Sequence, residues 1–309
     1  MNIAILGAGA IGQLLAHQLD TAGIAPLLLL KPEQAILTTP FLFEVQGLPN
    51  RCIPHGYDVF SLDDKHTATI LPEVDLLLVT LKAYQVVNAV KALLPQLSPH
   101  CHILLLHNGI GTHQELQPLL KGQGLSLGTT SQGALKLGPR SIRHTGEGMS
   151  QFGHFCGPAL ATDFKQQLLA AIPNSSWVDD ILPALWQKLA VNAVINPLTA
   201  LDNVPNGELT AARYQPTIKA VLQELQQVAD QEQIALDGEQ LAARVRQVMV
   251  LTSKNFSSMQ QDVAHQRRTE IDYINGYVVK RAAAHQLAAP TNQALVEQIT
   301  AREHAVAAR

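Results

Sequence analysis

The sequence contains few cysteines, few charged residues and no long apolar run. Its three cysteines, Cys52, Cys101 and Cys156, lie far apart and form no C-x-x-C pair. This number and spacing favour neither a disulfide framework nor a zinc site, and they suit a reducing cytoplasm. No apolar run reaches the roughly 18–20 residues that a membrane span needs, and the N-terminus lacks the basic stretch of a signal peptide. We therefore expect a cytoplasmic protein without a membrane segment.

Positive charge is not in excess either, since the sequence has 22 Lys and Arg residues and 25 Asp and Glu residues. This balance gives no electrostatic footprint for nucleic acid. The histidines are scattered, and only His100 and His102 lie close enough to resemble a ligand pair. Because no carboxylate or thiolate at a suitable spacing completes that pair, we expect no bound metal.

A glycine-rich turn follows the first apolar run, residues 2–7. The segment Gly7-Ala8-Gly9-Ala10-Ile11-Gly12, here called the glycine turn, leads into an amphipathic helix over 13–19 and a second apolar run over 26–30. A G-x-G-x-x-G turn between strand and helix lets the backbone approach a pyrophosphate at the helix N-terminus. Glycines can also serve close packing alone, but the order strand, turn, helix, strand favours dinucleotide binding.

The residue that closes the second strand indicates which nicotinamide is used. Enzymes that prefer NAD place Asp or Glu there, to accept a hydrogen bond from the ribose 2′-hydroxyl. This chain has Lys31, whose cation favours the 2′-phosphate of NADP, although Glu33 lies close enough to weaken that preference. Lys82 follows another buried apolar run, over 75–80, and is either a solvated charge or a second contact to the cofactor.

Further polar residues follow other predicted strands. Asn108 comes directly after the apolar run 102–106, at the end of a parallel strand where ligands bind. The segments Ser141–His144 and Met149–Gly153 predict a strand pair, with its turn at 146–148.

The pattern changes class along the chain. Runs typical of buried parallel strands continue to about residue 160, and from Leu182 onward only helical periodicity remains. The sequence therefore predicts an α/β, Rossmann-like doubly wound sheet over residues 1–172, followed by an all-α domain over 180–309. We expect the active site in the cleft between the two domains. The helices are expected at 182–201, about 215–234, 238–253, about 268–285 and 291–306.

The first helix of the second domain is almost wholly apolar, except for Lys188, Asn192 and Asn196. These residues are spaced at i, i+4 and i+8 and form one narrow face, here called the polar stripe. A lone lysine usually marks a solvated helix end. Here the apolar neighbours argue that the polar stripe faces partners, water or a ligand, because burying an unpaired polar group is costly. Pro197 cannot donate to the carbonyl of Ala193, which predicts a kink beside the stripe.

A second polar cluster extends over residues 257–276. Thr269 and Asp272 have the spacing of a capping box, and for Asp272 we favour this role as a helix-start charge. Glu270 lies one position inside the predicted cap. It can instead point across to the helix that carries Lys188.

Together these residues resemble the ketopantoate reductases (2-dehydropantoate 2-reductases) over nearly the whole chain. The last three of the shared motifs are together quite specific, whereas the glycine turn occurs in many dehydrogenases. The motifs are Gly7-x-Gly9-x-x-Gly12, Lys82-Ala-x-Gln85, Asn108-Gly109-x-Gly111, Lys188-Leu-Ala-x-Asn192-x-x-Ile-Asn196-Pro-Leu-Thr, Asn206-Gly-Glu, and Ser258-Met-x-Gln-Asp262 with Thr269-Glu270-Ile-Asp-x-Ile-Asn-Gly276.

The resemblance implies an NADPH-dependent reduction of 2-dehydropantoate to (R)-pantoate, a step towards pantothenate and coenzyme A. It implies that Lys188 donates the proton, and on chemical grounds we expect Glu270, as a counter-charge, to keep Lys188 protonated. The implied substrate residues are Asn108, Lys188, Asn192, Asn196, Asn206 and Ser258. The implied cofactor residues are Gly7, Ala8, Gly9, Ala10, Ile11, Gly12, Lys31, Lys82, Asn108, Ala134 and Glu270. The chemistry agrees, since a cationic lysine both stabilises charge on a ketone oxygen and protonates it.

Two positions depart from the family pattern. Lys31 stands where arginine is often found, which keeps the charge but loses bidentate phosphate contact. Gln132 stands where histidine is common, so the sequence leaves the role of the 130–134 loop open.

The sequence also leaves other functions open. A reductase of the same build acting on another branched 2-keto acid shares all the motifs. A non-catalytic NADP-binding regulator would keep the glycine turn and Lys31 but would not need the polar stripe. The partner in the favoured case is a small 2-keto acid, and the protein is a monomer or a homodimer.

Overall fold

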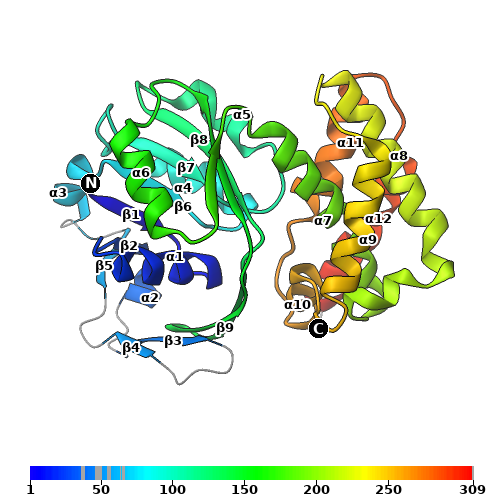
Figure 1. Ribbon diagram of the computed structural model, residues 1–309, viewed down its shortest axis with the longest axis horizontal. Helices are drawn as coiled ribbons and strands as arrows, with labels where there is room; N and C mark the ends of the chain where they lie inside the picture. The colour runs from blue at the N-terminus through cyan, green and yellow to red at the C-terminus, as the bar shows by residue number, and fades with distance from the viewer. Residues whose placement is uncertain (36–38, 46–50, 54–56, 63, 65–66, 308–309) are drawn as a thin grey trace. The chain divides into compact units, whose positions relative to one another are not determined.

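The computed structural model describes residues 1–35, 39–45, 51–53, 57–62, 64 and 67–307, and it divides into two compact units (Figure 1). The α/β unit comprises Met1–His107 and Thr112–Ile181, and the helical unit comprises Asn108–Gly111 and Leu182–Arg309. The predicted fold class, a Rossmann-like α/β domain followed by an all-α domain, is confirmed.

The main sheet of the α/β unit has eight described strands in the order β12-β11-β8-β7-β6-β1-β2-β5. Neighbouring strands are parallel, except that β8 and β11 are antiparallel. All four residues of β1 and of β6 are buried, as expected of apolar strands covered on both faces. The strands are β1 (Ile3–Leu6), β2 (Leu27–Leu30), β5 (Asp58–Ser61), β6 (Leu76–Val79), β7 (His102–Leu105), β8 (Gly124–Thr130), β11 (Ser150–Cys156) and β12 (Ser175–Val178).

Helices cover both faces of this sheet. Because β2 and β6 flank β1 on opposite sides, right-handed crossovers place α1 (Ala10–Thr21) and α4 (Ala83–Leu93) on opposite faces. Helix α6 (Thr162–Ala171) packs against α1, and α5 (Thr112–Leu116) packs against α4 (Figure 1). The strand order reverses between β1 and β6, and their carboxyl ends therefore form the switch point at which such sheets bind ligands. Shorter helices are α2 (Pro32–Ala35), α3 (Thr67–Ile70), η1 (Leu71–Glu73) and η2 (Gln117–Leu119).

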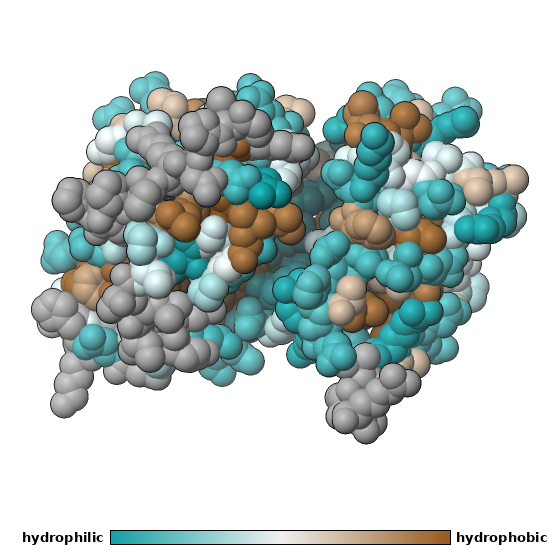
Figure 2. Space-filling view, turned by 90° about the horizontal axis from the view of Figure 1, so that it is seen from below, coloured by the Kyte–Doolittle hydropathy of each residue, from teal (hydrophilic) through white to brown (hydrophobic). Residues whose placement is uncertain are grey.

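A smaller sheet has the order β4-β3-β10-β9, with β3 (Phe41–Val45), β4 (Arg51–Ile53), β9 (Gly133–Gly138) and β10 (Ser141–Gly146). The predicted strand pair is wrong, because β10 pairs with β9 and β3, whereas β11 pairs with β8 and β12. The chain crosses from one sheet to the other at Gly148, where a Cβ would lie 2.3 Å from the Ser131 carbonyl carbon. The leucines of β9, Leu135 and Leu137, are exposed, and apolar residues are visible on the face of the α/β unit seen from below (Figure 2).

The helical unit is built around α7 (Leu182–Asp202), against which α8, α9, α10 and α12 all pack. The predicted helices at 182–201, 215–234, 238–253 and 291–306 are confirmed within a few residues at their ends. No helix in the described residues is long and apolar enough to cross a membrane. The other elements are α8 (Gln215–Gln231), α9 (Gly238–Leu251), α10 (Ser258–Ala264), α11 (Asn275–Ala284), α12 (Pro290–Ala307), η3 (Asn206–Thr210), η4 (Ala212–Tyr214) and η5 (Ile271–Tyr273).

The capping box predicted at Thr269 and Asp272 is wrong. The α-helix starts only at Asn275, after the 3-10 turn η5, and the Thr269 hydroxyl instead accepts a weak hydrogen bond of 3.3 Å from the Ile271 N–H. Asp272 is exposed and forms an i,i+4 ion pair with Arg268 at 3.2 Å. The local spacing fitted a cap, but the backbone between these residues does not adopt the α-helical turn that a capping box requires.

Candidate active site

The glycine turn follows β1 and crosses closely over the start of α1. Gly7 has a φ of +103°, and a Cβ on Gly12 would lie 2.1 Å from the Gly7 carbonyl oxygen. At Gly9, by contrast, a Cβ would meet only the Thr80 carbonyl oxygen at 3.9 Å. Gly9 is also the N-cap of α1 and makes no side-chain capping bond. The first N–H groups of α1 therefore lack a side-chain cap from Gly9, and the turn fits the pyrophosphate of a dinucleotide.

Two other parts of the α/β unit lie against the glycine turn. The Thr80 hydroxyl, just after β6, donates to the Gly7 carbonyl at 2.8 Å, and Lys82 follows as the partly exposed N-cap of α4. Ala134, on β9, packs against the same small apolar cluster as Ala10, the first residue of α1. The structure thus brings the predicted cofactor residues of three segments around one end of the sheet.

Lys136 is a neighbour of the glycine turn that the sequence analysis missed. Its ammonium donates to the Ala8 carbonyl at 3.3 Å. Since the two residues are 128 positions apart, no local pattern could have indicated this contact. Lys136 adds positive charge close to where a pyrophosphate would bind.

Lys31 lies at the carboxyl end of β2 and is exposed. Its backbone carbonyl accepts from the Ala35 N–H at 3.0 Å, which tightens the turn after the strand. Among the described residues, the Lys31 ammonium has no hydrogen-bond partner, so it is available to a phosphate. The side chain of Glu33, which was expected to weaken a preference for NADP, lies outside the described part of the structure.

Gln132 is buried in a network of neutral side chains. Gln18, on α1, donates to the Gln132 carbonyl oxygen at 2.7 Å, and the Gln132 amide donates to the Ser150 hydroxyl at 3.2 Å. The Gln132 N–H also donates to the Thr130 hydroxyl at 3.2 Å. The glutamine therefore ties the 130–134 loop to α1 and to β11 without adding charge.

The polar stripe lies on α7 as its spacing predicts. Asn196 is only 5% exposed, while Lys188 and Asn192 are half-buried. Neither asparagine side chain makes a hydrogen bond within the described residues. A buried amide without a partner costs roughly 1–3 kcal/mol, which is compensated if a ligand supplies the missing hydrogen bonds.

The surroundings of Lys188 change its pKa. Desolvation by burial lowers the pKa of Lys188 to about 8, and the negative charge of Glu270 opposes this shift. Part of the lysine surface is open to solvent, but the ammonium itself is largely surrounded by protein. At neutral pH the group is still mostly protonated, and its pKa is close enough to that pH for it to act as a general acid.

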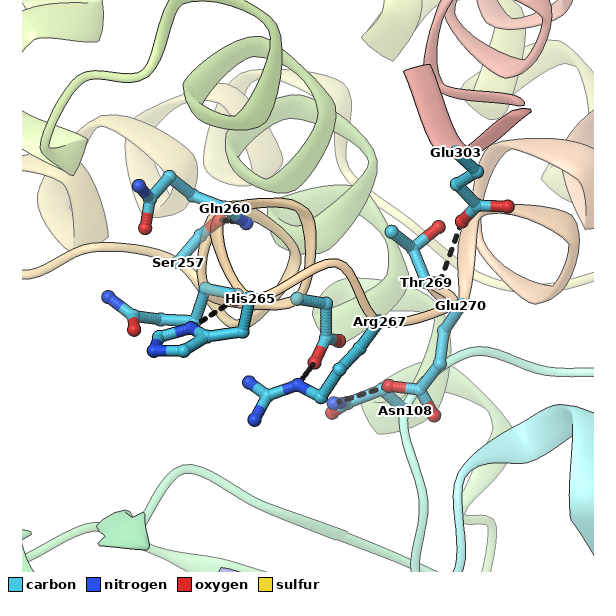
Figure 3. A network of polar contacts seen from close by, with 10 residues as sticks. Asn108, Ser257, Gln260, His265, Arg267, Thr269, Glu270 and Glu303 are labelled. Carbon is cyan, nitrogen blue, oxygen red and sulfur yellow. Dashed lines mark hydrogen bonds and ion pairs between the residues drawn. The ribbon is translucent and has the colours of Figure 1, made fainter. Parts of the chain in front are cut away.

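Glu270 is 4% exposed and accepts a hydrogen bond of 3.2 Å from the Asn108 side-chain amide (Figure 3). Asn108 belongs to the short segment that packs in the helical unit, where the Ile110 N–H donates to the Tyr273 carbonyl at 2.9 Å. Gly109 has a φ of +78°, and a Cβ there would lie 2.3 Å from the Tyr273 carbonyl oxygen. Only glycine therefore allows this segment to hold Asn108 against Glu270.

Asn206 and the two serines at the start of α10 have distinct roles. Asn206 is 7% exposed, and its amide donates to the Thr252 hydroxyl at 2.9 Å, whereas its carbonyl oxygen has no partner in the part of the chain that the structure describes. Ser257 caps α10 by accepting from the Gln260 N–H at 3.1 Å. Ser258 is exposed at the first position of the helix. Its hydroxyl is thus the one of the pair that is open to a ligand.

Arg267 is a second charged residue that the sequence analysis did not single out. Its Nε donates to the buried Asp262 carboxylate at 3.0 Å. Figure 3 shows that the side chains of Arg267 and Glu270 both extend towards the side on which Asn108 lies. The sequence signal was present, since both residues belong to the cluster 257–276.

The histidine pair considered as a metal site has a different role. His102 is buried in β7, and its Nε2 is 2.8 Å from the Ser126 hydroxyl. In the part of the chain that the structure describes, no three His, Cys, Asp or Glu residues are grouped so as to hold a metal ion.

Comparisons with known proteins agree on one family. The family model described as "Ketopantoate reductase PanE/ApbA" matches residues 3–157, and the model described as "Ketopantoate reductase PanE/ApbA C terminal" matches residues 180–303. The 2-dehydropantoate 2-reductase of Vibrio cholerae is 39% identical over 304 residues, which cover 98% of each chain.

Solved structures show the same architecture. A PanE/ApbA family ketopantoate reductase from Ralstonia eutropha JMP134 has a TM-score of 0.88 at 26% identity, covering 99% of this chain and 100% of that one. A D-mandelate dehydrogenase with NADH and anilino(oxo)acetate has a TM-score of 0.90 at 23% identity with the same coverage, and this likeness concerns the fold alone. Two family models that together match most of the sequence, and a relative aligned over nearly its full length, show that the chain belongs to the ketopantoate reductase family.

Proposed function

We propose that the protein reduces 2-dehydropantoate to (R)-pantoate with NADPH, in the cytoplasm, as a step towards pantothenate and coenzyme A. The relatives that bear the name 2-dehydropantoate 2-reductase support the substrate. One observation carries the chemistry: a half-buried lysine with a pKa of about 8 shares a helix face with two asparagines whose amides have no partner in the described residues.

The glycine turn, Lys31 and Lys82 are proposed to hold the cofactor, with Ala134, Asn108 and Glu270 as further contacts. When bound, NADPH supplies the hydride that reduces the ketone carbon. The N-terminal N–H groups of α1 suit its pyrophosphate, and the exposed ammonium of Lys31, which has no partner among the described residues, suits a 2′-phosphate. We accordingly assign residues 1–172 to cofactor binding and residues 180–309 to the substrate and catalysis.

Lys188 is proposed as the proton donor. As negative charge develops on the ketone oxygen, the ammonium stabilises that charge and transfers a proton to the oxygen. General acid catalysis of this kind raises the rate by roughly 10²–10⁴-fold. Glu270 favours the protonated lysine before the reaction, because its negative charge raises the lysine pKa. Asn108 steadies Glu270 through their hydrogen bond.

The asparagines are proposed to bind and orient the substrate. Amides such as Asn192 and Asn196 can donate to a carboxylate and accept from a hydroxyl without adding charge beside Lys188. Asn206 offers a carbonyl oxygen that no described residue binds, and Ser258 offers an exposed hydroxyl. These groups match a 2-keto acid that also carries a hydroxyl.

A second candidate is a reductase of the same build for another 2-keto acid. The likeness to D-mandelate dehydrogenase at a TM-score of 0.90 favours this alternative, since the fold serves more than one hydroxy acid. Initial rates with 2-dehydropantoate, with its analogue that lacks the hydroxyl, and with benzoylformate would separate the two. A site built to bind the hydroxyl should disfavour the analogue by well over 10-fold. Equal or better rates with the other keto acids would refute our choice.

A non-catalytic NADP-binding regulator is the third possibility. It would bind NADPH but would not oxidise it with any 2-keto acid. Steady turnover of NADPH with 2-dehydropantoate excludes it. Sedimentation of the purified protein would decide between a monomer and a homodimer, both of which remain predictions.

A further inference from the structure

The proline within α7 leaves one backbone acceptor without its helical donor. Pro197 lies inside the helix and has no N–H, so the carbonyl of Ala193, four residues earlier, loses its usual partner. Ala193 is fully buried, and water cannot replace the missing donor easily. Ala193 also follows Asn192 directly and precedes Asn196 by three residues. The open carbonyl is therefore in the middle of the segment that carries the polar stripe.

A side chain from another helix fills this position. Asn275, the first residue of α11, donates through its Nδ2 to the Ala193 carbonyl oxygen at 2.9 Å. Asn275 is fully buried, and its own Oδ1 has no hydrogen-bond partner among the described residues. The side-chain hydrogen bonds of Asn275 in this part of the structure are therefore made through its two N–H groups.

Asn275 is itself fixed by a buried network. The same Nδ2 donates to the Asn292 side-chain oxygen at 2.9 Å, and the Asn292 amide donates to the Glu224 carboxylate at 2.8 Å. Glu224 also accepts the backbone N–H groups of Thr291 and Asn292, at 2.8 and 2.9 Å, at the start of α12. Three helices, α8, α11 and α12, are thus connected through side chains to a single carbonyl of α7.

From this arrangement, and resting on the function proposed above, we propose that Asn275 is a positioning residue for the polar stripe. It replaces the hydrogen bond that Pro197 removes, and so holds the two halves of α7 in one alignment. The half before Pro197 carries Lys188, Asn192 and Asn196. Without Asn275, the halves can shift relative to each other, and a displacement of about 1 Å in a catalytic group can cost on the order of 10²-fold in rate.

Four proteins test this proposal: the wild type, Asn275→Ala, Pro197→Ala and the double variant. Pro197→Ala restores a backbone N–H four residues after Ala193, so that the helix can supply its own donor. We expect Asn275→Ala to lower kcat by roughly 10-fold or more in the Pro197 background, and by less than about 3-fold in the Pro197→Ala background. The dissociation constant of NADPH, measured by fluorescence, should stay the same in all four.

A matched control is Gln226→Ala. Gln226 is a partly buried amide on α8 that bonds to Asp230 and to the Leu236 carbonyl, and it has no part in the network. Its effects on melting temperature and kcat should simply add to those of Pro197→Ala. If the effects on kcat and melting temperature are non-additive only for the pair Asn275→Ala and Pro197→Ala, the Asn275 amide and a backbone N–H at position 197 replace each other as donors to the Ala193 carbonyl.

The proposal fails if Asn275→Ala costs the same in both backgrounds, or if it lowers only the melting temperature and leaves kcat and the pH profile unchanged. If Asn275→Ala does not fold alone, recovery of folding in the double variant supports the proposal, and an unfolded double variant beside a folded Pro197→Ala overturns it. Should the wild type reduce no 2-keto acid, the proposed function fails. The melting temperatures of the four proteins would then still show whether the Asn275 amide and a backbone N–H at position 197 replace each other as donors to the Ala193 carbonyl.

Discussion

The two units of the protein offer their candidate groups in opposite ways. In the α/β unit the glycine turn presents backbone N–H groups, and what matters is the absence of side chains, as at Gly12. In the helical unit the candidate groups are side chains on α7 and on the segment around Glu270, set in an apolar helix face. Substitutions in the glycine turn should therefore act by steric clash, whereas substitutions in the helical unit should act by changing charge and hydrogen bonding.

The largest expected effect lies in the helical unit. Lys188→Ala should lower kcat by roughly 10²-fold or more, because the interaction with the ketone oxygen strengthens in the transition state. In the wild type, kcat/KM should fall as the pH rises through about 8, where Lys188 loses its proton. This alkaline limb should be absent in the variant. The measurement is the pH profile of kcat/KM.

The neighbouring exposed residue on α7, Gln187, provides the control for Lys188. Gln187→Ala should leave kcat and the alkaline limb in place. A Lys188→Ala enzyme with near-normal kcat and the same limb would show that another group, or water, donates the proton. A rise in KM at constant kcat would instead identify a binding cation.

The next effect separates the two kinds of glycine in the α/β unit. Gly12→Ala places a Cβ 2.1 Å from the Gly7 carbonyl oxygen, and should cost about 1–3 kcal/mol or more in the free energy of unfolding. Gly9→Ala meets only the Thr80 carbonyl at 3.9 Å, so the fold should be kept. Its methyl group should nevertheless weaken NADPH binding, by blocking the approach of the pyrophosphate. Urea unfolding and cofactor titration of both variants test this, and unchanged NADPH affinity in Gly9→Ala would contradict it.

Lys31 is a charged side chain in the α/β unit, where the glycine turn offers mainly backbone groups. Lys31→Ala should raise the KM for NADPH by roughly 10-fold and leave that for NADH almost unchanged, since only NADPH carries the 2′-phosphate. Wild-type values of kcat/KM for the two cofactors give the reference and should favour NADPH. Equal losses with both cofactors would show that Lys31 does not contact the 2′-phosphate.

The next expected effect is that of the Glu270 charge on the pKa of Lys188. Its negative charge raises the pKa of Lys188, in opposition to desolvation by burial. Glu270→Gln keeps the size and a hydrogen-bonding oxygen for Asn108 but removes the charge, so the Lys188 pKa should fall. The alkaline limb of kcat/KM should then move to lower pH. A limb that stays in place or moves to higher pH would show that Glu270 does not control the lysine.

The contrast also explains how much could be read from the sequence. The glycine turn and the polar stripe are local patterns, because strand, turn, helix order and i, i+4 spacing fix their geometry within a few residues. The fold class followed from the change in hydrophobic period near residue 180. Interpreting the stripe as catalytic, however, depended on the family resemblance as well as on its spacing.

Other features could not be predicted because they depend on contacts between distant segments. Strand β10 could pair with either of the strands that flank it in the sequence, and the structure shows that it joins β9, whereas β11 joins β8. The contact of Lys136 with Ala8 joins residues 128 positions apart, and that of Asn275 with Ala193 joins residues 82 apart. The predicted capping box failed for the opposite reason, since a correct local spacing was overridden by the turn that precedes α11.

The smallest expected effect concerns stability at acidic pH, where the α/β unit should lose stability more than the helical unit. Burial, together with the electrostatic influence of His154 and Lys165, lowers the pKa of His102 to about 4, and burial together with His107 lowers the pKa of His113 to about 4. In the unfolded chain both imidazoles titrate near pH 6.5. The unfolded state therefore binds more protons between about pH 6.5 and 4, and the stability of the α/β unit should fall as the pH drops through that window.

The chain carries one reporter in each unit, because Trp177 lies on β12 and Trp186 on α7. With Trp186→Phe, the fluorescence of Trp177 should show a lower urea midpoint at pH 5 than at pH 7. His102→Gln, which can keep the hydrogen bond to Ser126 but cannot take up a proton, should reduce that difference. With Trp177→Phe instead, the transition seen by Trp186 should respond less to His102→Gln, since His102 is in the other unit. If His102→Gln leaves the difference between pH 5 and pH 7 unchanged at Trp177, the buried histidine is not what makes the α/β unit acid-sensitive.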